Sequence, residues 1–317
     1  MKILAMVLAG GNGTRLHPLT AEYAKPALPL AAGYRIIDFV LSNLVNSGIS
    51  PIYVLVQYKP QPLIEHIRTA WATWSRGEKP AIAVVFPETN GVSAGFSGTA
   101  DAVYQNLHLI ERHKPDLVAV FAADHVYRMD VRQMACFHQE RGAEVSIAAA
   151  RVPIAQASAF GIMAVGPAGE LHEFLEKPER PASIPTDPLR AYASMGNYLF
   201  NPRVLVELLE EANRRGDTDF GHDIMPLLPG RRRAWAYDFA SNTVPGVQPY
   251  EERGYWRDIG TVDAYRAAQC DVLGPLPCFS LVNAEWPIHS DAYRVRRRIA
   301  PPAATASAET RRIAVSA

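Results

Sequence analysis

Leu8-Ala9-Gly10-Gly11-Asn12-Gly13-Thr14-Arg15-Leu16 follows directly after Ile3-Leu4-Ala5-Met6-Val7, an apolar run that predicts a buried strand. The three glycines carry no Cβ, so the backbone N–H groups of the turn can close around a phosphate. Arg15, and Lys25 shortly beyond the turn, supply the positive charge that a polyphosphate needs. The turn has neither the terminal Gly-Lys-Ser/Thr of a Walker A loop nor the spacing of the Gly-x-Gly-x-x-Gly motif. It therefore indicates a nucleoside triphosphate as ligand.

The composition limits the classes of protein that the chain can belong to. Its 317 residues, 48% of them apolar, suit one large α/β domain or two small ones. Lys plus Arg and Asp plus Glu number 32 each, so no overall field draws the protein to nucleic acid or a membrane, and no apolar run approaches membrane-spanning length. The 3 cysteines form no C-x-x-C pair, which favours reduced thiols in the cytoplasm over a zinc site.

Strand and helix patterns alternate through the first half of the chain. Strands are expected at 3–8, 52–57, 82–86, 117–122 and 144–152, and helices at 36–46, 63–74, 99–113 and 131–141, the third capped by Ser97 or Thr99. Further strands at 161–165, 171–176, 193–200 and 234–239 and helices at 204–215 and 262–273 follow. This order predicts a Rossmann-like α/β fold, with a mostly parallel central sheet and helices on both faces.

Polar side chains follow several of these strands, at the carboxyl ends where α/β proteins collect their ligands. A buried carboxylate such as Asp124 is costly unless it is paired or binds a metal, and together with Asp258 it could share Mg²⁺. Lys177 offers a cation for phosphate beside Glu176, an acceptor for hydroxyl groups, as a sugar phosphate requires. Three alternatives stay open: a helix cap for Asp124, a turn into the next helix for Asp258, and a plain ion pair for Glu176 with Lys177.

Taken together, the motifs resemble those of the sugar-nucleotide pyrophosphorylases, and within them the bacterial glucose-1-phosphate adenylyltransferases. Besides the glycine turn, the matching stretches are Ala24-Lys25-Pro26-Ala27, Tyr34-Arg35-Ile36-Ile37-Asp38-Phe39, Gly98-Thr99-Ala100-Asp101, Asp124-His125-Val126-Tyr127, Phe160-Gly161-Ile162-Met163, Glu176-Lys177-Pro178, Ala193-Ser194-Met195-Gly196 and Tyr255-Trp256-Arg257-Asp258-Ile259-Gly260-Thr261. The resemblance runs to about residue 302. It implies the nucleotide-diphospho-sugar transferase fold and synthesis of ADP-glucose and pyrophosphate from ATP and glucose 1-phosphate, for glycogen-type glucan synthesis.

The resemblance also implies a role for each matching residue. Those expected to cradle the ATP phosphates are Gly10, Gly11, Gly13, Thr14 and Arg15, with Lys25 nearby. Those expected on the adenosine side are Gln57, Gly98 and Thr99. Those expected to bind glucose 1-phosphate are Gly161, Glu176, Lys177 and Ser194. The catalytic set is Arg15, Lys25, Asp124 and Asp258, of which the two acids hold Mg²⁺; His125 is assigned no catalytic role.

The chain departs from the family pattern in several places. Members carry a second, C-terminal domain, a left-handed β-helix, and this chain ends where that domain would begin. We therefore expect a catalytic domain over 1–275, a linker-like extension over 276–300 and a disordered tail over 301–317, with self-association or a full-length paralogue as possible partners. Phe96 and Ser97 replace a tyrosine and an arginine, and Asn12 replaces a common arginine. Two alternatives remain: a transferase for another base or sugar, or a catalytically silent nucleotide-sugar-binding subunit.

Overall fold

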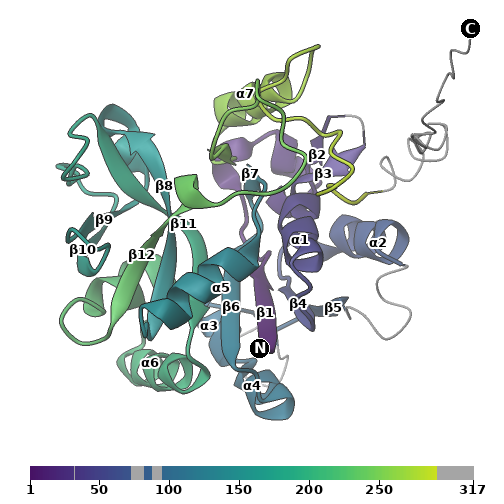
Figure 1. The fold of residues 1–317 in the computed structure, drawn as a ribbon. Helices are drawn as coiled ribbons and strands as arrows, with labels where there is room; N and C mark the ends of the chain where they lie inside the picture. Colours follow the sequence, from purple (N-terminus) through teal and green to yellow (C-terminus); the bar gives the residue numbers. More distant parts are fainter. Residues whose placement is uncertain (32, 73–81, 88–94, 291–317) are drawn as a thin grey trace, which may run out of the picture.

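A computed structural model describes residues 1–31, 33–72, 82–87 and 95–290 of the chain, and a nine-stranded mixed sheet forms its centre (Figure 1). The strands are β1 (Ile3–Leu8), β4 (Ile52–Leu55), β5 (Ile82–Val85), β6 (Leu117–Ala122), β8 (Val145–Pro153), β9 (Gly161–Val165), β10 (Leu171–Glu176), β11 (Arg190–Phe200) and β12 (Ala234–Asp238). Their order is β10-β9-β11-β6-β1-β4-β5, and β8 lies against both β11 and β12. The Rossmann-like α/β fold expected from the sequence is confirmed.

The direction of the strands decides where ligands can gather. β6, β1, β4 and β5 are parallel, as the alternating pattern predicts. β11 is antiparallel to both β6 and β8, and β12 is parallel to β8. Because two reversals restore the direction, the carboxyl ends of β1, β6, β8 and β12 all reach the same edge of the sheet.

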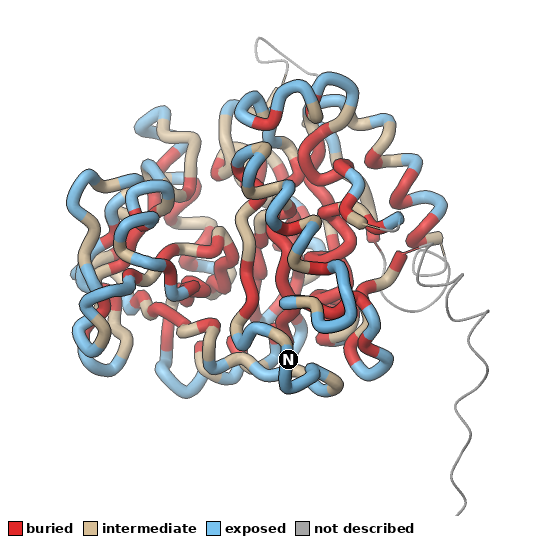
Figure 2. Tube along the Cα trace, turned by 90° about the horizontal axis from the view of Figure 1, so that it is seen from above, coloured by how far each residue is buried: buried red, intermediate tan, exposed pale blue. Residues whose placement is uncertain are grey.

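Helices cover both faces of the sheet (Figure 1). They are α1 (Ile36–Asn46), α2 (Pro60–Ala70), α3 (Thr99–Tyr104), α4 (Leu107–His113), α5 (Val131–Glu140), α6 (Pro202–Arg215) and α7 (Val262–Asp271). Along β1, Ile3, Ala5 and Val7 belong to a buried cluster with α1, α2 and α5, whereas Leu4 and Met6 face α3, α4 and α6. This alternation is the period of a strand that is buried on both faces, and Figure 2 shows the buried core enclosed by exposed turns.

The helix expected over 99–113 is wrong in one respect, because the structure divides it into α3 and α4. Asn106 is buried at the junction and its side-chain amide donates to the carbonyl of Ala102, at 2.9 Å, so a side chain competes with the backbone ladder. The residue at the N-cap of α3 is Gly98, not Ser97 or Thr99. α2 begins earlier than expected, with Pro60 at its first position, and ends at Ala70, while residues 73–74 of that prediction lie outside the described residues.

Short elements complete the molecule. They are the strand pairs β2 (Pro29–Leu30) with β3 (Tyr34–Arg35) and β7 (His125–Tyr127) with β13 (Trp256–Asp258), the 3₁₀ turns at Thr14–Leu16, Leu19–Ala21, Lys25–Ala27, Ile154–Ala159, Met225–Leu227 and Phe239–Ser241, and a π-helical turn at Phe220–Ile224. Beyond α7, Phe279, Leu281 and Ile288 join a third buried cluster around Phe39. The tail expected at 301–317 lies outside the described residues. Within the described ranges, no helix combines the length and apolarity that crossing a bilayer demands.

Candidate active site

The glycine turn leaves the carboxyl end of β1 in a conformation that only some residues accept. Gly13 has φ +63°, and a Cβ there would lie 3.0 Å from Cγ2 of Thr20. The Thr20 hydroxyl donates to the Gly13 carbonyl at 2.9 Å, which holds the turn closed. At Gly11, by contrast, a Cβ would meet nothing within 4 Å. Thr20 therefore holds the turn in place at Gly13, whereas the backbone at Gly11 is open and a ligand can approach it.

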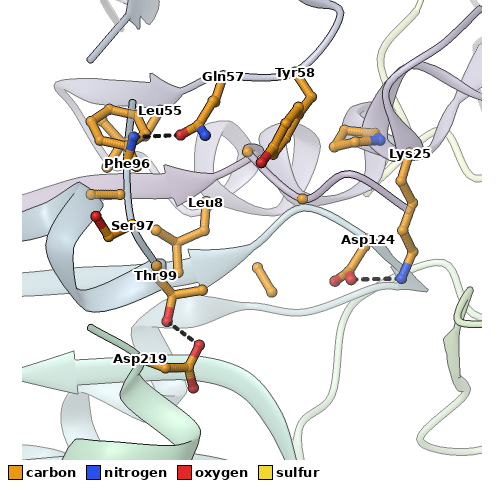
Figure 3. Close-up of a pocket in the computed structure, with 16 residues that line it drawn as sticks. Leu8, Lys25, Leu55, Gln57, Tyr58, Phe96, Ser97, Thr99, Asp124 and Asp219 are labelled. Atoms are coloured by element: carbon orange, nitrogen blue, oxygen red, sulfur yellow. Dashed lines mark hydrogen bonds and ion pairs between the residues drawn. The ribbon is translucent and has the colours of Figure 1, made fainter. Parts of the chain in front are cut away.

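The two predicted acids come together at the end of the β7–β13 pair. β13 pairs with β7 so that Asp258 lies opposite His125, and the Ile259 N–H donates to the carbonyl of Asp124 at 3.1 Å. Nζ of Lys25 lies 2.6 Å from Oδ2 of Asp124 and 3.4 Å from Oδ1 of Asp258. Figure 3 shows the Lys25 ammonium reaching the Asp124 carboxylate. One lysine thus bridges acids that are far apart in the sequence.

Electrostatics favour the charged forms of Asp124 and Lys25. Burial opposes ionisation of Asp124, but the charge of Lys25, followed by that of His125, holds the pKa of Asp124 well below its usual range. Burial likewise disfavours the ammonium of Lys25, yet Asp124 and Asp258 outweigh it and raise the pKa of Lys25. Neither acid caps a helix: the side chain of Asp130 caps α5 and that of Thr261 caps α7. The capping interpretation of Asp124 is therefore wrong.

The same cluster fits a divalent cation. Asp124, His125 and Asp258 each offer one ligand atom, and these atoms lie within 4.8 Å of one another. Among the residues that the structure describes, the buried Oδ1 of Asp124 accepts no hydrogen bond, and it lies 3.1 Å from Nε2 of His125. Carboxylate and imidazole donors at this spacing could hold a metal ion that is shared with phosphate oxygens. His125 had no assigned role, although its place beside Asp124 in Asp124-His125-Val126-Tyr127 was a signal.

Two cavities meet at Asp124. The first cavity has a volume of about 300 Å³ and lies beside the glycine turn. Its lining includes Gly10, Gly11, Lys25, Gln57, Tyr58, Phe96, Gly98 and Thr99. The second, of about 320 Å³, is lined by Arg15, His125, Phe160, Gly161, Glu176, Lys177, Ser194, Tyr198, Trp256 and Asp258. The residues common to both are Leu8, Thr99, Ala122, Asp124 and Asp219. Of the residues expected from the sequence to form the site, all but Gly13 and Thr14 line one cavity or the other.

Close backbone approaches shape the first cavity. A Cβ at Gly98 would lie 2.4 Å from the carbonyl oxygen of Thr218, so only glycine fits there without movement. Next to it, the Thr99 hydroxyl donates to Asp219 Oδ2 at 2.9 Å. Across the cavity, Oε1 of Gln57 accepts the N–H of Phe96 at 2.6 Å (Figure 3). Gly98 and Thr99, at the N-terminus of α3, thus pack directly on Thr218 and Asp219, which precede the π-helical turn.

The second cavity is built on β9, β10 and β11. A Cβ at Gly161 would lie 2.6 Å from Cζ of Phe174 and 2.8 Å from Oε2 of Glu176, so glycine leaves room for the carboxylate. Lys177 forms an ion pair with Glu176, which was one of the alternatives left open by the sequence. Both residues also line the cavity. Lys177 has φ +47°, which is costly for a residue with a side chain and is held by its N–H bond to the Phe160 carbonyl, at 3.0 Å.

Sequence reasoning missed Asp219, which lines both cavities. Its Oδ1 accepts the N–H of His222, at 3.0 Å, and so caps the π-helical turn. Asp217-Thr218-Asp219 follows the helix stop at Gly216, and this run of capping residues could have marked a helix start. Trp256 was also missed; its ring lies 5.2 Å from that of His125 and 5.5 Å from that of Phe160, so it forms an aromatic wall beside the acids.

Comparisons with known proteins identify the family of the chain. The nucleotidyl transferase family profile matches residues 4–274. The glucose-1-phosphate adenylyltransferase of Thermodesulfovibrio yellowstonii is 51% identical over 293 residues, covering 92% of this chain and 71% of that protein. The enzyme of that name from Thermus thermophilus is 47% identical over 313 residues, covering 96% of this chain and 73% of its own. Members of the family generally use a divalent metal ion, for which the acids at the two cavities are suited. The chain therefore belongs to the nucleotidyl transferase family.

Proposed function

We propose that this protein is a glucose-1-phosphate adenylyltransferase, which makes ADP-glucose and pyrophosphate from ATP and glucose 1-phosphate in glucan synthesis. The observation that carries the proposal is the junction of two cavities at Asp124: one bears the glycine turn and the other bears Glu176 and Lys177. Relatives about half identical over most of the chain have this name. The three cysteines are free and exposed, which fits a cytoplasmic location.

The triphosphate would bind in the first cavity. The open backbone at Gly11 would accept its phosphates beside Gly10. Thr14 and Arg15 follow in the same turn and would complete the cradle, with Arg15 on the side of the second cavity. Gln57 and the Gly98–Thr99 turn would border the adenosine, because they line the same cavity as Gly10 and Gly11. The tight contact of Gly98 with Thr218 fixes the wall in place before the ligand arrives, which reduces the entropic cost of binding.

The sugar phosphate would bind in the second cavity. Lys177 would leave its ion pair with Glu176 to contact the phosphate, and Glu176 would then accept hydrogen bonds from sugar hydroxyls. Gly161 lets the Glu176 carboxylate lie close to the backbone, and Ser194 offers a hydroxyl whose oxygen accepts the Gly196 N–H at 3.2 Å. Both substrates would then approach one another over Asp124.

In the reaction, a phosphate oxygen of glucose 1-phosphate attacks the α-phosphorus of ATP. The bond from the α-phosphorus to the oxygen that bridges to the β-phosphate breaks, and its electron pair leaves with pyrophosphate. No protein nucleophile is needed, so the protein acts by positioning and by neutralising charge. Arg15 and Lys25 offset the charge of the triphosphate, and Lys177 offsets that of the attacking phosphate. Asp124 and Asp258 would hold Mg²⁺, which when bound supplies further neutralisation of phosphate charge.

Pyrophosphate release by the purified protein tests the proposal. The assay runs over a panel of triphosphates (ATP, UTP, dTTP and GTP) and of sugar 1-phosphates, each with and without Mg²⁺. We expect turnover with ATP and glucose 1-phosphate that exceeds every other pair at least tenfold. A preference for another base or sugar would replace the assignment with another sugar nucleotidyltransferase. Binding of ADP-glucose without turnover for any pair would identify a silent binding subunit and would refute the proposal.

A further inference from the structure

A hydrogen bond between two fully buried polar side chains joins β7, the strand beside the acids, to β11, a strand of the second cavity. Nδ2 of Asn197 in β11 donates to the hydroxyl oxygen of Tyr127 in β7, at 3.0 Å. Neither residue lines a cavity of the candidate active site, but each lies three positions beyond one that does, Asp124 in one case and Ser194 in the other. The bond therefore connects two parts of the site from outside it.

Asn197 lies where the pairing of β11 changes. From Asn197 to its end, β11 pairs with β6, whereas nearer its start it pairs with β9 through residues 192–193. In the stretch between these two pairings its register against β8 also shifts. Ser194 and Gly196 lie in that stretch and line the second cavity. The side-chain bond of Asn197 thus holds β11 at the border of its irregular stretch.

The backbone of β7 is held separately by α1. Nδ2 of Asn43 donates to the carbonyl of Tyr127 at 3.3 Å, and Oδ1 of Asn43 accepts the N–H of Met129 at 2.9 Å. β13, which ends at Asp258, pairs with β7 along its whole length. Because β7 is anchored to α1 and carries β13 with it, the Tyr127 hydroxyl is a polar link between the fixed acid cluster and β11.

β11 approaches the acid cluster closely at its irregular stretch. Gly196 has φ +65°, and a Cβ there would lie 3.1 Å from Cβ of Ala122 and 3.7 Å from Cε1 of His125. These two residues flank the segment that contains Asp124. A small shift of β11 relative to β7 would therefore change the distance between Ser194 and the acids.

Stability alone gives a poor explanation of this polar pair. A buried amide is costly unless all its polar atoms are paired, and each unpaired atom needs an explanation. Among the residues that the structure describes, Oδ1 of Asn197 accepts no hydrogen bond. The amide is therefore retained at a cost, and what it supplies is a directional bond to Tyr127 that fixes the relative position of two strands.

We propose that Tyr127 and Asn197 are positioning residues, whose hydrogen bond sets the spacing between the acid cluster and the wall of the second cavity. This inference rests on the proposed function, because the spacing matters where two substrates meet over Asp124. Misplacing reacting groups by about 1 Å can cost about a hundredfold in rate, even when the altered residue is remote from them. Loss of the bond should therefore lower kcat more than it raises either KM.

Steady-state kinetics of Tyr127→Phe tests the inference, because this change removes only the hydroxyl group and keeps the ring. We expect kcat to fall at least about tenfold, with the KM for ATP and for glucose 1-phosphate each within about threefold of the wild-type value. Asn197→Leu removes the donor and should lower kcat by a similar factor. The double variant should fall no further, because both changes break the same bond.

Tyr237→Phe is the matched control. The Tyr237 hydroxyl is buried and accepts the same kind of bond, from Nδ2 of Asn242 at 2.9 Å, but Tyr237 lines neither cavity. Both Tyr→Phe variants should lose a similar amount of thermal stability, whereas the control should keep wild-type kcat. A purely structural role predicts the same kcat for Tyr127→Phe and the control, and that result overturns the inference. Independent, multiplying losses in the double variant overturn it too.

A second measurement separates failure of this inference from failure of the proposed function. If the wild-type protein turns over no substrate pair, the proposed function fails, and calorimetric binding of ADP-glucose decides the inference instead. This ligand would span both cavities, so its Kd should rise at least about tenfold in Tyr127→Phe and stay unchanged in Tyr237→Phe. Equal affinity in the two variants, or no binding of ADP-glucose by the wild type, would then overturn the inference as well.

Discussion

Replacing Asp124 by asparagine removes one negative charge and leaves the shape of the side chain almost unchanged. In the native protein, Oδ2 of Asp124 lies 2.6 Å from Nζ of Lys25, while Asp258 is more distant at 3.4 Å. The substitution therefore takes away the nearer partner of the lysine and one of the proposed metal ligands. It also leaves Lys25, which is 8% exposed, with a single weaker ion pair.

The size of the effect follows from these two losses. Removing one preorganised electrostatic group from an active site costs about 2.7–4 kcal/mol of transition-state stabilisation, or about 10²–10³ in turnover. In the proposed mechanism Asp124 is both the partner of Lys25 and a metal ligand, so we expect kcat to fall by at least about a hundredfold. Global stability should change much less, because the Asp124 side chain is 33% exposed and asparagine still accepts from the lysine.

The assay is the initial rate of pyrophosphate release at saturating ATP, glucose 1-phosphate and Mg²⁺, with urea unfolding as a measure of folding. Asp263→Asn is the matched control, since that side chain is 95% exposed at the first turn of α7 and lies away from both cavities. The control should have wild-type turnover. Near-normal kcat for Asp124→Asn at saturating Mg²⁺ would remove Asp124 from the mechanism, and with it the argument from the paired acids.

Three further perturbations give separate outcomes. Lys177→Gln should raise the KM for glucose 1-phosphate at least about tenfold and leave the KM for ATP unchanged in steady-state kinetics, because one charged phosphate contact is lost. Gly98→Ala would place a Cβ 2.4 Å from the carbonyl oxygen of Thr218, so the wall of the first cavity must shift. We expect the free energy of unfolding measured in urea to fall by about 1–3 kcal/mol and the KM for ATP to rise. An unchanged urea midpoint would contradict the tight fit. Burial lowers the pKa of His138 in the folded protein. Because the unfolded chain binds the proton more readily, the free energy of unfolding should decrease as pH falls below about 6.5. His138→Asn should flatten the pH–stability profile below that pH.

The positions of the glycine turn and of Asp124 could be predicted from the sequence alone. The glycine turn after β1 and the position of Asp124 after β6 depend on local patterns, an apolar strand followed at once by turn residues or an acid. Parallel strands then place both at one edge of the sheet without further information. These parts could be predicted because each requires only a few neighbouring residues and one rule of topology.

The meeting of Asp124 with Asp258 could be proposed only from the residue types and the family resemblance. It depends on β13, a strand of three residues, which pairs with another of three residues. Strands this short carry no detectable alternation, and their pairing is decided by the packing of Trp256 against His125 and Phe160. Nothing in a local window indicates that packing.

The arrangement of the second cavity was harder to predict from the sequence, for a different reason. β11 was expected from residue 193 but begins at Arg190, and its register against β8 shifts between Ser194 and Tyr198. Gly196, with φ +65°, lies in this irregular stretch. A bulge of this kind re-aims side chains, and the Ser194 oxygen thereby accepts the Gly196 N–H beside the second cavity. A sequence pattern shows the strand but not the shift in register.

The antiparallel insertion of β11 also explains why strands beyond β6 end at the same edge of the sheet as the parallel run. Without β11, the parallel run β5-β4-β1-β6 would end at β6. With it, β8 and β12 again run in the direction of β6, and their carboxyl ends bring Arg151 and Asp238 to the same edge. β11 itself begins at this edge with Arg190, and four positions later it contributes Ser194 to the second cavity.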